Sequence, residues 1–216
     1  LHSFPTRRSS DLTIFQNEDD IRQFTQARIV SAQKARVILG SGINTNLFSP
    51  TQISESAKNQ LKTEFNIQPD EIVVTMISRI IRSKGVFEFM QSARELQEMN
   101  PKTHFLLIGA EDVESMDRLT REEMAQLQQA VDWRGHRSDV PTILSISDIF
   151  VLPSIYREGI PRVLLEAAAM ELPIITTNSP GCKEVVDDGN NGFLIPAHNP
   201  KALSNAIAHL VESPEL

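Results

Sequence analysis

The stretch IVVTMISRIIRSKG, residues 72–85, decides the fold of this 216-residue chain. Its first six residues form a continuous apolar run, which is typical of a strand covered on both faces. A basic loop with Arg79 and Lys84 follows, and an amphipathic stretch that predicts a helix begins near Val86. A strand, a loop and a helix in this order form one unit of a doubly wound parallel sheet.

The same alternation continues along the chain. Further strands are predicted at residues 36–38, 104–108, 148–152, 173–176 and 193–195. Helices are predicted at residues 54–65, 86–99, 118–131, 162–170 and 200–212. The last is the clearest, because Asn199 can cap it and Pro200 stands at the tolerated first position. The expected fold class is therefore α/β, a doubly wound, Rossmann-like parallel sheet, which binds its ligands at the carboxyl ends of the strands.

Three segments are expected along the chain. Residues 1–12 (LHSFPTRRSSDL) lack the apolar centre of a signal peptide, and we interpret them as a leader foreign to the protein, with a transit peptide as the alternative. Gly40-Ser41-Gly42 and the Asn- and Pro-containing residues after it indicate a domain junction. Residues 13–39 are then the remnant of an upstream domain, and residues 40–216 form the main domain, truncated at its end.

Composition excludes several classes of function. The net charge of -7 argues against a nucleic-acid partner, which requires a surplus of Lys and Arg. The one cysteine, Cys182, cannot form an internal disulfide, so a reducing, cytoplasmic environment is expected. No apolar run reaches the roughly 18 residues of a membrane-spanning helix.

The basic loop after the strand at 72–77 is the first candidate for chemistry. Arg79 and Lys84 lie five residues apart, so their side chains can converge on one diphosphate, Arg as a planar fork and Lys as a mobile charge. A solvated basic loop is the alternative. Neither the dinucleotide fingerprint nor the P-loop spacing occurs here.

The second candidate is PSIYREGIPRVLLEA, residues 153–167, which follows the strand at 148–152. Gly159 permits close approach of a ligand, and Pro161 suits the first turn of a helix, whose positive end favours an anion. Glu166 falls in an apolar run, so its carboxylate requires a partner when buried: ligand hydroxyls, a backbone cap or an Arg.

The spacing of Glu158 and Glu166 bears on their role. Eight residues of helix span about 12 Å, whereas the two carboxylates of a glycosidase lie about 5–9.5 Å apart. The spacing therefore favours two contacts along an extended ligand over a hydrolytic pair.

The third segment, residues 176–192, leads from a strand through a Pro-Gly turn to a predicted helix start. Cys182 has no neighbouring His to activate it. We therefore interpret it as a small, semi-buried residue and not as a nucleophile. No His, Cys and Asp residues share the spacing of a metal site.

Six stretches together resemble the C-terminal domain of glycosyltransferase family 4, whose members have the GT-B fold and retain the anomeric configuration. They run in the family's order and include the E-x7-E spacing: GSGINTNLF (40–48), SRIIRSKG (78–85), FLLIG (105–109), SDIFVLPS (147–154), EGIPRVLLEA (158–167) and PGCKEVVDDGNNGFLIP (180–196).

The resemblance implies a role for each candidate residue. Arg79 and Lys84 would hold the donor diphosphate and stabilise the leaving nucleotide, while Glu158 would bind the transferred sugar and Glu166 the ribose hydroxyls. The implied donor contacts are completed by backbone near Gly159, Ile160, Pro161 and Arg162, by the Trp133–Gly135 loop beside the base, and by Arg157, Cys182, Lys183 and Glu184 near the sugar. The family requires no metal cofactor.

The lead-in to Glu158 and the PGCKE turn look most like bacterial enzymes that build surface polysaccharides. These imply transfer of a hexose or N-acetylhexosamine from a UDP-sugar to a glycan or polyprenyl-linked acceptor, with peripheral contact to the inner membrane through an upstream domain. Pro161 and Asn44 depart from the Gly and Asp of many members, which leaves the shape of the sugar pocket open. The alternatives are a nucleotide-sugar-binding module or epimerase of the same architecture, or an unrelated doubly wound module.

Overall fold

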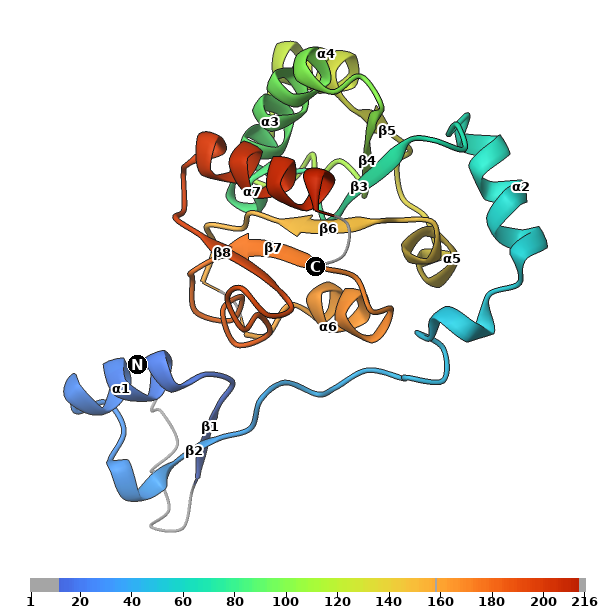
Figure 1. The fold of residues 1–216 in the computed structure, drawn as a ribbon. Helices are drawn as coiled ribbons and strands as arrows, with labels where there is room; N and C mark the ends of the chain where they lie inside the picture. The colour runs from blue at the N-terminus through green and yellow to red at the C-terminus, as the bar shows by residue number, and fades with distance from the viewer. Residues whose placement is uncertain (1–11, 158, 214–216) are drawn as a thin grey trace.

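The computed structural model describes residues 12–157 and 159–213 and contains two parallel sheets (Figure 1). The smaller sheet pairs β1 (Thr13–Phe15) with β2 (Ala35–Val37), and α1 (Glu18–Gln26) connects them. A long extended segment, interrupted by the 3₁₀ turn η2 (Pro50–Gln52), then leads into the larger part of the chain.

The larger sheet has six parallel strands in the order β5-β4-β3-β6-β7-β8. Its strands are β3 (Ile72–Ile77), β4 (Thr103–Ile108), β5 (Asp132–Trp133), β6 (Ile149–Leu152), β7 (Ile174–Thr177) and β8 (Gly192–Ile195). Successive strands move outward from β3 to β5, and the chain then returns to place β6 on the other side of β3. The predicted doubly wound sheet is confirmed, and its switch point lies between β3 and β6.

Helices cover both faces of this sheet (Figure 1). One face carries α3 (Val86–Met99), α4 (Arg121–Ala130) and α7 (Pro200–Glu212), whereas α2 (Glu55–Phe65), α5 (Val140–Ser145) and α6 (Arg162–Ala169) lie on the other. Neighbouring residues of β4 show why: Phe105 and Leu107 join the core cluster with α3 and α4, while Leu106 and Ile108 join the cluster with α2 and α5. A strand buried on both faces has no polar side, which is why it appears in the sequence as a continuous apolar run.

The sequence predicted β3, α3 and α7 with their observed boundaries. The Oδ1 of Asn199 accepts the N–H of Ala202 at 2.9 Å, so the predicted cap of α7 is present. In contrast, α4 begins at Arg121 and not at residue 118, because Thr120 and Glu123 close a capping box there. The helix predicted after Pro180 is wrong, since residues 180–185 form turns.

The short elements α1, α5, β1 and β5 were not predicted. The strands β1 and β5 and the helix α5 are two to six residues long, too short to show a clear period, whereas α1 has nine residues and an Asn17 cap that could have predicted it. In the described part of the chain, no helix combines the length and the apolar character that crossing a membrane requires.

Candidate functional site

The loops that follow β3 and β6 meet at the switch point. The carbonyl oxygen of Ser83 accepts the N–H of Ile155 at 2.9 Å and the hydroxyl of Ser154 at 3.3 Å. Gly85 has φ +80°, and a Cβ on it would lie 2.2 Å from the carbonyl oxygen of Pro153. Only glycine can therefore occupy this position, where one backbone rests directly on the other.

The basic loop after β3 carries the two predicted phosphate ligands. Lys84 ends the 3₁₀ turn η3 (Arg82–Lys84) and precedes Gly85, so its backbone lies at the junction of the two loops. Arg79 instead pairs with Asp112, with 2.8 Å between Nη1 and Oδ2, and its side chain is 61% exposed. An exposed pair of this kind contributes about 0–1 kcal/mol, so Arg79 can exchange Asp112 for a phosphate at little cost.

Acidic residues from the segment after β4 hold the same loop. Arg82 forms a two-pronged ion pair with Glu123, and the carboxylate of Asp117 accepts the N–H of Ser83 at 2.7 Å. These supports could not be predicted from the sequence, because nothing in the spacing of the acids indicates a partner 34 or 41 positions earlier.

Glu166 lies on the first turns of α6 with its side chain only 14% exposed. Its ion partner is the exposed Arg162, at 3.6 Å between Nη2 and Oε1. Burial raises the pKa of the Glu166 carboxyl, and Arg162 offsets this only in part. A largely buried carboxylate with one distant cation is well suited to accept hydrogen bonds from ligand hydroxyls.

The residues that precede α6 lie against the N-terminal part of the chain. Gly159 faces the side chain of Gln16, whose Oε1 occupies the place that a Cβ on Gly159 would take. Ile160 lies beside Gly40. Pro161 is the N-cap of α6, one position before the predicted first turn. Glu158 lies outside the described residues, so its predicted role stays a prediction.

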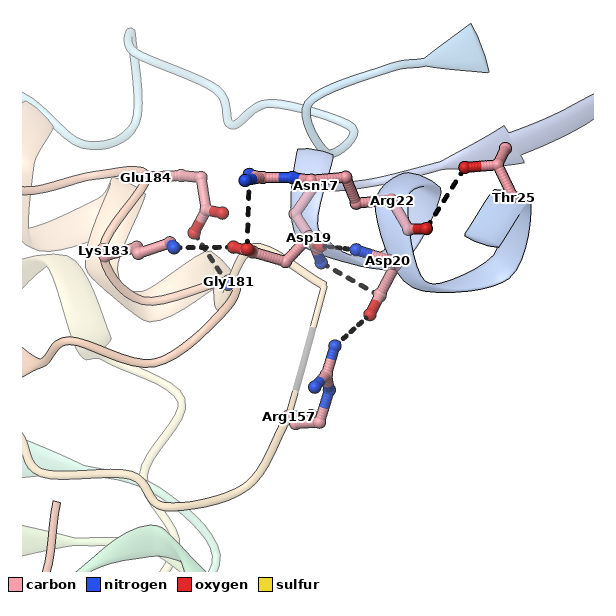
Figure 2. Close-up of polar contacts among 9 residues, drawn as sticks. All are labelled: Asn17, Asp19, Asp20, Arg22, Thr25, Arg157, Gly181, Lys183 and Glu184. Carbon is pink, nitrogen blue, oxygen red and sulfur yellow. Dashed lines mark hydrogen bonds and ion pairs between the residues drawn. The ribbon is translucent and has the colours of Figure 1, made fainter. Parts of the chain in front are cut away.

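Three predicted sugar contacts lie around the loops after β6 and β7 (Figure 2). Arg157 pairs with Asp20 at 2.7 Å and Lys183 with Asp19 at 2.6 Å, so both cations face α1. The carboxylate of Glu184 accepts the N–H of Gly181 at 2.7 Å and closes its own turn.

Cys182 differs from its prediction. Its side chain is fully buried in the main core cluster, so the thiol is not semi-buried and is not exposed to a ligand. The turn at 180–185 turns this apolar residue inward while it directs Lys183 toward α1.

The Trp133–Gly135 loop lies at the carboxyl end of β5. Trp133 donates its indole N–H to the carbonyl of Gly109 at 2.8 Å, and the carbonyl of Gly135 accepts the N–H of Gly109 at 2.8 Å. Both residues thus brace the end of β4, and their predicted contact with a base stays a prediction. Within residues 12–157 and 159–213, no group of three or more His, Cys, Asp or Glu side chains could hold a metal ion.

The carboxyl edge of the sheet thus gathers the basic loop, the start of α6 and the turn after β7. Comparison with protein families matches residues 57–216, more than half of the chain, to the model described as "Glycosyl transferases group 1". The chain belongs to this glycosyltransferase family. The predicted family membership and GT-B architecture are confirmed.

Relatives of this group 1 chain act in bacterial glycan synthesis. The chain is 35% identical over 203 residues to the N,N'-diacetylbacillosaminyl-diphospho-undecaprenol alpha-1,3-N-acetylgalactosaminyltransferase of Campylobacter jejuni. The matched residues make up 94% of this chain and 52% of that protein. The chain is 27% identical to the UDP-Gal:alpha-D-GlcNAc-diphosphoundecaprenol alpha-1,3-galactosyltransferase of Escherichia coli, covering 98% and 54%. The chain therefore spans about half the length of these relatives.

Solved structures show the same fold. The crystal structure of Anabaena Alr3699/HepE in complex with UDP superposes with a TM-score of 0.83 at 25% identity, covering 95% of this chain and 55% of that one. WaaG, a glycosyltransferase of lipopolysaccharide biosynthesis, shares the fold alone, with a TM-score of 0.77 at 17% identity over 94% of this chain and 54% of that one.

Proposed function

We propose that this chain is the donor-binding half of a retaining glycosyltransferase that moves a hexose or N-acetylhexosamine from a UDP-sugar to a hydroxyl of a glycan or lipid-linked acceptor. The observation that carries the proposal is the junction of the loops after β3 and β6. The basic loop contacts the loop that leads into α6 there, and the largely buried Glu166 lies on that helix, after a strand that ends at the edge where doubly wound sheets bind ligands.

The chemistry is electrostatic and positional. Arg79 and Lys84 would bind the diphosphate and stabilise the charge that develops on the departing nucleotide. Backbone N–H groups before α6 would assist them. The acceptor hydroxyl would attack from the face that the nucleotide leaves, the departing phosphate would take its proton, and the configuration would be retained. Because these cations supply the compensating charge, the proposed reaction requires no metal ion.

The proposed donor, acceptor and location are supported by what related proteins bind and by their names. The neighbouring HepE structure holds UDP, and the two bacterial relatives are named for undecaprenol-linked sugars. We also propose a peripheral location at the cytoplasmic face of the inner membrane, since a lipid-linked acceptor would lie in that membrane.

A calorimetric screen of this chain against UDP, GDP, ADP and their sugars tests the proposal. UDP and one of its sugars should bind at least about tenfold more tightly than the other nucleotides, a difference of about 1.4 kcal/mol. A chain that binds no nucleotide, or that prefers ADP, would contradict it. Incubation with the bound UDP-sugar should give no epimer by NMR, which separates transferase from epimerase.

Glu166→Gln is expected to stabilise the chain at neutral pH. A carboxyl with a raised pKa binds its proton more tightly when folded, so its contribution to stability is greatest below the unfolded pKa and is lost as pH rises through the folded pKa. The variant should melt about 2 °C higher at about pH 7.5 and nearly unchanged at about pH 4. The exposed Glu98→Gln, on α3, is the control and should show no such pH-dependent gain.

The same variant should lose recognition of ribose. Wild-type chain is expected to bind UDP about tenfold more tightly than 2′-deoxy-UDP, since a hydrogen bond to a charged group is worth about 1.5–3 kcal/mol. Glu166→Gln should bind both nucleotides alike. Equal losses for both would show that Glu166 does not contact the ribose.

A further inference from the structure

The first turn of α1 contacts the two loops that the family resemblance implies to lie near the transferred sugar (Figure 2). Oδ1 of Asp20 lies 2.7 Å from Nη2 of Arg157, on the loop after β6, and Oδ2 of Asp19 lies 2.6 Å from Nζ of Lys183, on the turn after β7. Two consecutive residues of the N-terminal part therefore bridge two separate loops more than 130 positions away.

The position of Asp20 is fixed by the cap of α1. Asn17 is fully buried, accepts the N–H of Asp20 at 2.8 Å and donates its amide to Oδ2 of Asp20 at 3.0 Å. One carboxylate oxygen thus holds the cap and the other is directed at Arg157. Lys183 lowers the pKa of the neighbouring Asp19 carboxyl, so this partner stays ionised near neutral pH.

Long cationic side chains on loops have many rotamers, and an ion pair to a fixed acid favours the rotamers that form it, by about 0–1 kcal/mol for an exposed pair. A hollow of about 510 Å³ opens beside these pairs, lined by residues of α1 together with Arg157 and Pro180. Gln16, also from the N-terminal part, rests on Gly159 at the start of α6. The N-terminal part thus forms one wall of the space next to the sugar loops.

We infer that Asp19 and Asp20 are positioning residues of the donor site, which hold Lys183 and Arg157 in place for the sugar end of the donor. The inference rests on the proposed function and assigns residues 13–37 a part in selecting the donor. Among the described residues, no ion pair or hydrogen bond joins either acid to the loop after β3, so binding of the nucleotide end should not depend on them.

The test compares the Asp19→Asn/Asp20→Asn variant with Glu18→Gln. Glu18 is an exposed acid of the same helical turn, and no ion pair is found for it among the described residues. Calorimetry measures the Kd of UDP and of UDP-glucose, UDP-galactose, UDP-GlcNAc and UDP-GalNAc. The double variant should keep UDP affinity within about twofold and lose about five- to tenfold in affinity for the best UDP-sugar. Glu18→Gln should match wild type for both.

A second measurement needs no ligand. Amide hydrogen exchange at residues 154–157 and 181–186 should accelerate in the double variant and not in Glu18→Gln. Unchanged exchange would overturn the inference whether or not a sugar nucleotide binds, and equal losses for UDP and UDP-sugar would overturn it by showing a general structural defect. Failure of wild type to bind UDP would instead contradict the proposed function alone.

An exchange of charges completes the test. Asp20→Arg should accelerate amide hydrogen exchange at residues 154–157, and adding Arg157→Asp should restore part of the slower exchange, because the pair forms again with opposite polarity. No restoration, with both variants folded, would show that the pair does not position the loop.

Discussion

Replacing Arg79 and Lys84 together with alanine is expected to weaken UDP binding by about 100-fold or more. Each hydrogen bond to a charged group contributes about 1.5–3 kcal/mol, and about 1.4 kcal/mol corresponds to tenfold in Kd. Both residues lie on the loop that meets the loop after β6, and Arg79 gives up only an exposed pair with Asp112. Isothermal calorimetry with UDP and UMP measures the effect, and the loss should be larger for UDP because it carries the second phosphate.

Lys102→Ala is the matched control for this variant. Lys102 is exposed and forms an ion pair with Asp70. It lies just before β4, at the amino end of the sheet and away from the proposed site. Its removal should leave both affinities unchanged. A change of less than about threefold in the double variant would mean that the basic loop is a solvated surface, the alternative that its sequence left open.

Gly85→Ala should cause a large loss of stability. Alanine at φ +80° costs about 1–2 kcal/mol, and its Cβ would in addition lie 2.2 Å from the carbonyl oxygen of Pro153. We expect a total of about 3 kcal/mol or more, which lowers Tm by about 6–12 °C for a domain of this size. Separation of the two loops should also weaken UDP binding by at least about tenfold in the folded variant.

Gly189→Ala isolates the contribution of the contact. Gly189 has nearly the same φ, +79°, but no atom of the described residues lies within 4 Å of its Cβ position. It lies in the turn before β8, at the opposite end of the sheet. This variant should lose only the stability that alanine at positive φ costs, about 1–2 kcal/mol, and should keep its affinity for UDP. Equal losses of Tm in the two variants would show that the approach of Gly85 to Pro153 contributes nothing. Thermal unfolding by circular dichroism provides both values.

The pattern of apolar residues was enough to predict the architecture, for a physical reason. Strands such as β3 and β4 are buried on both faces, so their apolar runs depend on little except the layers above and below them. The caps of α7 are local as well, since Asn199 and Ala202 are three residues apart. In contrast, α5 and β5 are short, and their periodicity is too weak to distinguish them from loops.

The site could be predicted only in part. Arg79, Lys84 and the start of α6 follow strands, so the rule that parallel strands end at one edge was enough to group them. The acidic partners of Arg79, Arg157 and Lys183 could not be predicted, because Asp112, Asp20 and Asp19 are distant from them in sequence and acidic residues are usually solvated. The thiol of Cys182 was misjudged for a related reason: which side of a turn faces the core depends on the packing around it.

By itself, the sequence determined the doubly wound sheet, the family and the loops that carry the chemistry, because apolar periodicity and short motifs are local properties of the chain. Only the tertiary structure decided how these loops are held. It showed that Gly85 must be glycine because Pro153 rests on it, and that the acids of α1 face the cations of two distant loops. Such contacts arise where the folded chain brings together residues more than 65 positions apart, and no local pattern encodes them.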